Sequence, residues 1–149
     1  MRLFGRHAEV RAEVGDGFVA GEAVALQTSF QAALTGRERS AREPVPAELQ
    51  LDGGKGGRVV LVWRNVVVGF VPPAHEADLR GQLHRAGKDR LVCPGQVYRD
   101  GDVWRVWVGA RPPAGAPEPE PGSDRLAAPP TRIFGLALPR PVDDDEDED

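Results

Sequence analysis

Two valine-rich runs separated by two residues constrain the fold of this chain more than any other feature. The runs are RVVLVW at residues 58–63 and VVVGFV at residues 66–71. β-Branched residues favour strands, and apolar runs this short are typical of strands rather than helices. Only Arg64 and Asn65 lie between the runs, and asparagine tolerates the positive φ of a tight turn. We therefore predict a central β-hairpin, because apolar residues on both faces of a strand need cover on both sides.

A helix is predicted directly after this hairpin. Pro72 and Pro73 cannot donate hydrogen bonds to a strand ladder, and proline suits the first turn of a helix. Glu76 and Arg80 are spaced to form an i,i+4 ion pair on that helix. Three apolar residues recur at helical spacing and would share one face, namely Leu79, Leu83 and Ala86.

The rest of the body has weaker signals of the same kind. Residues 7–14 alternate as a strand, and a glycine turn leads into a second strand over residues 18–26. Residues 28–36 favour a short helix, and after a loop residues 47–51 alternate again. A second hairpin is predicted within residues 91–109, around the Asp-Gly pair at positions 100 and 101.

The predicted order is β-β-α-β-β-β-α-β-β. Pro94 lacks a backbone donor, so its strand is predicted to lie at a sheet edge or to carry a bulge. The fold class is mainly β with two short helices (α+β). A small, partly closed β-barrel with a helix across it would bury so many short strands.

Composition divides the chain into a body and a C-terminal extension. Residues 1–110 are expected to form the domain, with a core of about 18–110. Residues 111–130 hold seven of the 14 prolines and are predicted to be a linker. Residues 131–142 are a short apolar segment and a possible docking motif. Residues 143–149 are all acidic, which predicts a solvated, disordered tail beside a mildly basic body.

Several classes of protein do not fit this sequence. No apolar run reaches the roughly 20 residues of a membrane-spanning helix, and the N-terminus is charged, so we expect a cytoplasmic protein. Cys93 is the single cysteine, which excludes an internal disulfide. His7, His75 and His84 are scattered without other ligands at metal-binding spacing. We expect no metal, no cofactor and no enzymatic activity.

Basic and aromatic residues provide the candidate binding site. Trp104 and Trp107 should lie on opposite faces of their strand, one in the core and one exposed beside arginines, where it could stack on bases. Packing of that tryptophan under the proline-rich segment is an equal alternative. The GGKGG string around Lys55 lacks the ending of a phosphate-binding loop, and a flexible hairpin connection is favoured. The candidate nucleic-acid-binding residues are Lys55, Arg58, Arg64, Phe70, Arg105 and Trp107.

Three strings in residues 18–109 resemble the HIRAN family, small β-barrel modules attached to helicases and other DNA-repair proteins and also found alone in bacteria. Gly69, Phe70, Val71 and Pro72 stand in the Gly-Tyr-Leu-Pro positions of the family signature, Gly21 and Glu22 resemble its lead into the first helix, and VCPGQVYRDGDVWRVWVG resembles its last strand pair. LDGGKGGR replaces the family's Asp-rich loop.

The resemblance implies a HIRAN-type barrel and a non-catalytic binding module. It implies single-stranded nucleic acid or DNA ends as the ligand, in a repair or genome-maintenance setting. The alternative is a protein–protein interaction module, in which the C-terminal segment or a sheet edge docks a partner.

Overall fold

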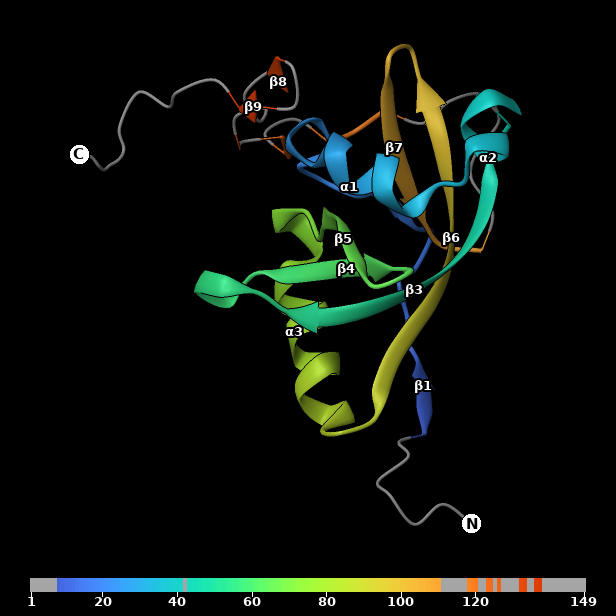
Figure 1. The fold of residues 1–149 in the computed structure, drawn as a ribbon. Helices are drawn as coiled ribbons and strands as arrows, with labels where there is room; N and C mark the ends of the chain where they lie inside the picture. Colours follow the sequence, from blue (N-terminus) through green and yellow to red (C-terminus); the bar gives the residue numbers. More distant parts are fainter. Residues whose placement is uncertain are drawn as a thin grey trace, which may run out of the picture.

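One curled β-sheet carries the fold. The computed structural model describes residues 8–41, 43–110, 118–120, 123–124, 126, 132–133 and 136–137. Its strands are β1 (Glu9–Arg11), β2 (Phe18–Val19), β3 (Val45–Gly53), β4 (Val59–Trp63), β5 (Val66–Phe70), β6 (Arg90–Asp100) and β7 (Val103–Val108), and its helices are α1 (Gln27–Ala33), α2 (Gly36–Ala41) and α3 (Pro73–Ala86). Two 3-10 turns, Ala23–Leu26 and Lys55–Gly57, complete this part of the chain (Figure 1).

The strands are hydrogen-bonded in the order β2-β7-β6-β3-β4-β5. These neighbours are antiparallel, whereas β1 runs parallel to β6 at the side of the sheet. The two ends of the order approach each other, because Gly21 and Phe70 form an isolated antiparallel bridge with N···O distances of 2.7 and 3.0 Å. The prediction of a mainly β, α+β fold is confirmed, and the sheet curls into a half-barrel.

The central hairpin forms as predicted. β4 and β5 pair, and Arg64 and Asn65 have φ values of 51° and 70°, the left-handed pair that a two-residue turn requires. The register shifts after Leu61, so β5 carries one extra residue there. The two valine-rich runs therefore form adjacent paired strands, with a bulge in β5.

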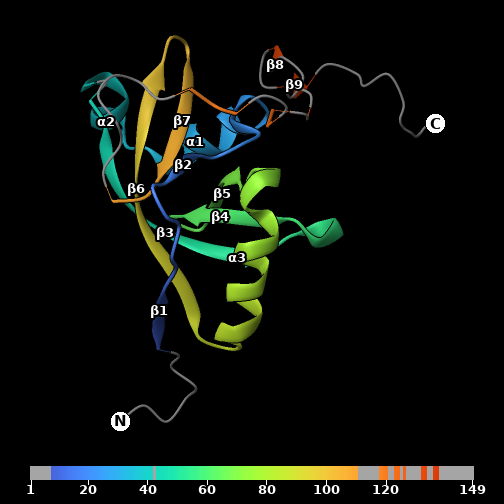
Figure 2. The ribbon, with the colours of Figure 1, turned by 180° about the vertical axis from the view of Figure 1, so that it is seen from behind.

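Helix α3 also begins and packs as predicted. It starts at Pro73, and the Glu76 and Arg80 side chains pair at 3.6 Å. Leu79 is fully buried, and Leu83 and Ala86 pack against the same core. The helix contacts β3, β4 and β6, and Figure 2 shows it lying along the sheet. α1 covers β5 and β7.

Three predictions about secondary structure need correction. The strand predicted over residues 18–26 ends at Val19, and Ala23–Leu26 forms a 3-10 turn instead. Residues between α1 and β3, predicted as a loop, contain the additional helix α2. Its cause is a capping box: the Thr35 hydroxyl accepts from Glu38 N–H at 3.1 Å, and the Glu38 carboxylate accepts from Thr35 N–H at 2.9 Å. The spacing of these two residues is the signal that indicates this helix.

The last of these corrections concerns Pro94. Its strand β6 is central, with β3 along one side. On the other side β6 pairs with β1 up to Val92 and with β7 from Gly95, so Pro94 lies at the change of partner. The Pro94 carbonyl accepts from Gly109 N–H at 2.9 Å on that side. A missing N–H is tolerated there because no ladder donor is needed at the change.

The C-terminal extension is described only in parts. β8 (Arg132–Ile133) pairs with β9 (Leu136–Ala137) inside the predicted docking motif at residues 131–142. Six residues between 118 and 126, within the predicted linker, are described, and four of them contact the body, as set out below: Glu120, Ser123, Asp124 and Leu126. The predicted acidic tail at residues 143–149 lies outside the described residues, as does His7.

Gly69 is predicted to be required by close packing. A Cβ built at Gly69 would lie 2.6 Å from the Ala20 Cβ, so the neighbour is the chain after β2. We expect Gly69→Ala to destabilise the protein by about 1–3 kcal/mol through overpacking. A double variant that combines Gly69→Ala with Ala20→Gly should recover part of the lost stability, because the facing methyl group is removed. Gly81→Ala in α3, where the nearest atom is the end of the Arg85 side chain at 3.4 Å, is the control and should not destabilise. Equal unfolding midpoints in urea for wild type and Gly69→Ala would contradict the packing argument.

Cys93 is predicted to be unreactive in the folded protein. Its side chain is fully buried, and burial raises the pKa of the thiol to about 11. At pH 8 only about one thiol in a thousand would then be ionised. Ellman's reagent should react slowly with native protein and quickly, with one thiol per chain, in urea. Fast labelling without denaturant would show that the core opens at this strand.

Candidate binding site

A buried glutamate marks the candidate site. Glu22 follows the Gly21 bridge, precedes the Ala23–Leu26 turn and is fully buried. Its φ of 65° lies in the left-handed region, which is uncommon for a residue with a side chain. Buried carboxylates need a partner of opposite charge, and strained backbone is concentrated at functional positions. Both properties direct attention to this residue.

Arg58 is the charged partner of Glu22. Its Nη1 lies 2.9 Å from the Glu22 carboxylate, and its guanidinium carbon lies 4.3 Å from the centre of the Phe70 ring. Glu76 of α3 lies 3.8 Å from Arg58 Nε, too far for a hydrogen bond. Arg58 Nε and Nη2 are buried without a hydrogen-bond partner in the described structure. We call Glu22, Arg58, Phe70 and Glu76 the Glu22 site.

Part of the C-terminal extension docks at this site. Glu22 N–H donates to the Ser123 carbonyl at 2.9 Å, and Leu126 N–H donates to Glu22 Oε1 at 2.7 Å. Ser123 is buried, and a Cβ at Gly21 would lie 2.5 Å from its carbonyl oxygen. A glycine at position 21 therefore allows the two backbones to approach closely. We call the described residues 118–120, 123–124 and 126 the docked segment.

Two side-chain contacts anchor the docked segment. The Arg105 guanidinium, which is nearly buried, lies 3.1 Å from Asp124 and 3.1 Å from Asp100. His75 Nε2 lies 3.2 Å from the Glu120 carboxylate, and the His75 ring stacks on Phe18 with 4.4 Å between centroids. The docked segment thus contacts the body through its backbone and through two acidic side chains.

Of the six predicted binding residues, Arg58 and Phe70 lie in the Glu22 site, and Arg105 contacts the same docked segment through Asp124. Lys55 is exposed at the start of the Lys55–Gly57 turn, three residues before Arg58 in the sequence. Arg64 makes two bonds to Glu38, at 2.7 and 3.0 Å, and a third to the Ala33 carbonyl.

Trp104 and Trp107 are both buried, so the first of the two alternatives, an exposed tryptophan beside arginines, is wrong. Trp104 is 2% exposed and belongs to the main core, whereas Trp107 is 6% exposed and packs with Val19 and Tyr98. The prediction that they face opposite sides of the strand agrees with these separate clusters. Burial of Trp107 leaves no open ring face on which a base could stack.

The same burial affects the tyrosine beside Trp107. Burial raises the pKa of Tyr98 to about 12, so this hydroxyl stays protonated at neutral pH.

No group of three His, Cys, Asp or Glu side chains in the described ranges could hold a metal ion. None of the described helices is long and apolar enough to cross a membrane.

Comparisons with protein-family models, with curated proteins and with solved structures find no match to this chain. The function must therefore be inferred from the site itself.

Sequence reasoning does not identify the role of Glu22 or of the docked segment. Glu22 enters only through the family resemblance, since a glutamate before an apolar run is usually exposed. Asp124 lies 19 residues from Arg105 in a proline-rich stretch, and no local pattern links them. The non-local pairing of these charges could not be read from spacing.

The Glu38–Arg64 pair generates a pH prediction. Bonds from the Arg64 guanidinium and from Thr35 N–H lower the pKa of Glu38 from its ordinary value of 4.5 to about 2. A carboxyl with a lowered pKa in the folded state stabilises the protein above pH 4.5, and this contribution is lost as the pH falls toward 2. We expect Glu38→Gln to lose about 1 kcal/mol or less at pH 7, since the pair is partly exposed.

Urea unfolding at pH 7 and at pH 2.5 checks this prediction, provided that both proteins remain folded in the absence of urea. The difference between wild type and Glu38→Gln should shrink at the lower pH. Glu43→Gln, which replaces an exposed acid just beyond α2, is the control and should show little difference at either pH. A difference for Glu38→Gln that is independent of pH would contradict the ion pair as its cause.

Proposed function

We propose that this protein is a non-catalytic binding module with a HIRAN-like barrel, and that its Glu22 site binds a short acidic polypeptide segment. The observation that carries the proposal is the docked segment, whose Ser123 carbonyl and Leu126 N–H both bond to Glu22. The HIRAN likeness is supported by position: the Gly21-Glu22 string and the Gly69–Pro72 string meet at the Gly21–Phe70 bridge.

The contacts define the chemistry of the ligand. A backbone carbonyl reaches Glu22 N–H, and an N–H three residues later reaches the Glu22 carboxylate. The residue directly after that carbonyl presents a carboxylate to Arg105 at 3.1 Å. A turn with an acidic residue in its second position satisfies all three contacts. Another protein that presents such a turn could therefore take the place of the docked segment.

The charges around the site favour a peptide over a nucleic acid. Arg58 and Arg105 each bond to a carboxylate at 3.1 Å or less. The pair between Arg105 and Asp124 is already a contact between a basic residue of the body and an acidic side chain of a polypeptide. Stacking of a base has no comparable support there, because Trp107 is buried.

Single-stranded nucleic acid or a DNA end is the second candidate. Arg58 over the Phe70 ring is an arrangement on which a base could stack, and Lys55 is exposed close by along the chain. Arg58 Nε and Nη2 also lack a hydrogen-bond partner in the described structure and could donate to an anionic group of a ligand. This candidate requires the docked segment to leave.

Peptide binding to chains with altered docked segments tests the proposal. Asp124→Ala with Leu126→Pro removes the Arg105 contact and the N–H donor while leaving the Glu22 site intact. We expect a fluorescein-labelled peptide of residues 118–126 to bind this variant at least about tenfold more tightly than it binds wild type, because the internal competitor is weakened. Fluorescence anisotropy measures both affinities.

Gly21→Ala is the matched control. Its new methyl group would occupy the place of the Ser123 carbonyl, so it should displace the docked segment and also reject the peptide. Equal peptide binding by Gly21→Ala and by the double variant would refute the Glu22 site. If a labelled single-stranded oligonucleotide binds the double variant and the peptide does not, with affinity that falls steeply as salt rises, the second candidate is correct.

A further inference from the structure

Strand β1 is an open edge of the sheet. Its single strand neighbour in the described structure is β6, and Figure 2 places it at the margin of the molecule. All three of its residues are exposed, and Val10 is 37% exposed, one of few large apolar side chains so placed. Open strand edges are templates for pairing with another strand.

The hydrogen bonds to β6 determine which backbone groups of β1 point outward. The Ala8 carbonyl accepts from Arg90 N–H at 2.9 Å, and Ala12 N–H donates to the Val92 carbonyl at 2.8 Å. Groups alternate in direction along a strand, so residues 8, 10 and 12 face β6. The N–H and C=O groups of Glu9 and Arg11 therefore face away from the sheet.

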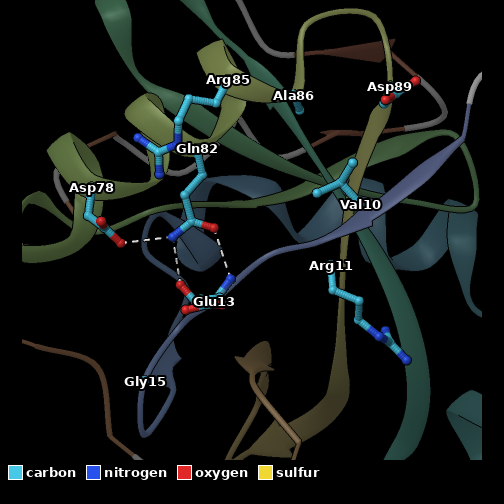
Figure 3. Close-up of a pocket in the computed structure, with 9 residues that line it drawn as sticks. All are labelled: Val10, Arg11, Glu13, Gly15, Asp78, Gln82, Arg85, Ala86 and Asp89. Atoms are coloured by element: carbon cyan, nitrogen blue, oxygen red, sulfur yellow. Dashed lines mark hydrogen bonds between the residues drawn. The ribbon is translucent and has the colours of Figure 1, made fainter.

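Glu13 is the next residue whose backbone groups point away from β6, and these groups already have a hydrogen-bonding partner. Glu13 N–H donates to Gln82 Oε1 at 2.9 Å, and the Glu13 carbonyl accepts from Gln82 Nε2 at 2.8 Å. These are the two bonds that a neighbouring strand would make, supplied by a side-chain amide of α3 (Figure 3). A cleft of about 540 Å³ lies between α3 and residues Val10 and Arg11. The edge of β1 is therefore accessible at these two residues, and Gln82 covers the chain only further along, at Glu13.

We propose that two copies of this chain associate by antiparallel pairing of their β1 strands, centred on Val10. In this register Val10 lies opposite Val10 of the second copy, and Glu9 lies opposite its Arg11. The parity fits, because Glu9 and Arg11 carry the outward backbone groups and would form the hydrogen-bonded pairs. The side chains of each such pair have opposite charges and would lie directly across from each other.

The charges also exclude the neighbouring registers. Antiparallel pairing centred on Glu9 would place two carboxylates directly opposite each other, and pairing centred on Arg11 would do the same with two guanidinium groups. Like charges directly opposite are destabilising. The Glu9 carboxylate can serve both partners, since Arg90 of the same chain contacts only its Oε2, at 3.2 Å. The sequence Glu-Val-Arg is thus complementary to itself in one register.

A charge-reversal experiment with full-length protein tests the pairing. Sedimentation velocity over a range of concentrations should show a reversible dimer of the wild type. Arg11→Glu places two carboxylates opposite each other in both cross-strand pairs of the dimer, and Glu9→Arg places two guanidinium groups opposite each other in both. We expect each substitution to weaken dimerisation at least about tenfold. An equimolar mixture of the two variants should regain association, because every cross-strand pair then has opposite charges.

Two controls separate this contact from other causes. Arg37→Glu makes the same charge change as Arg11→Glu at an exposed position of α2 and should leave dimerisation unchanged. Val10→Cys should form a disulfide between copies under mild oxidation, because facing residues of a non-hydrogen-bonded pair lie close enough, whereas Ala8→Cys, which lies opposite Ala12, should not.

A wild type that stays monomeric at all concentrations, with no Val10→Cys crosslink, overturns the proposal. So does a dimer that survives Arg11→Glu unchanged. Failure of the two charge variants to associate when mixed would show that the copies meet elsewhere.

Discussion

The ion pair between Glu22 and Arg58 joins the two ends of the curled sheet, and the surrounding structure depends on it. Glu22 follows β2, the first strand of the sheet order, whereas Arg58 precedes β4, close to the other end. A fully buried carboxylate without its partner is strongly unfavourable, and breaking such a pair on one side typically costs about 3–5 kcal/mol. Because Arg58 also lies on the Phe70 ring, the pair holds both sides of the Gly21–Phe70 bridge in place. The docked segment, the start of α3 and the lead into α1 are all arranged around it.

Much of the fold could be predicted because its signals are local. The valine runs and the Arg64-Asn65 turn are contiguous in the chain, and so are the prolines that begin α3. Helix α2 is not predicted although the Thr35 and Glu38 spacing indicates it, because a loop with prolines follows directly. Propensity alone places Pro94 at an edge. Its tolerance in a central strand depends on where β1 ends and β7 begins, which is tertiary information.

The candidate site could not be predicted in the same way. A count of basic residues treats Arg58, Arg64 and Arg105 as equally available, but each is held by a carboxylate. Two of those partnerships join residues 26 or more positions apart, as in Glu38 with Arg64 and Glu22 with Arg58. Likewise, the alternation that separates Trp104 from Trp107 predicts which way each ring points, but it does not reveal what covers it. Burial of Trp107 depends on Val19 and Tyr98, which come from other strands.

The docked segment would lower the apparent affinity of the Glu22 site for an external ligand. Only nine residues, 109–117, join it to β7, so a segment of its own chain is always present near Glu22. For a short tether, the effective concentration of such an internal competitor is on the order of millimolar. A ligand that binds the exposed site with micromolar affinity would therefore bind with a weaker apparent affinity, and acidic peptides that bind the exposed site weakly would be excluded unless they are abundant. The proline-rich extension would then determine how tightly a ligand must bind in order to displace the docked segment. The length and stiffness of the chain would determine this affinity, rather than any contact with the ligand.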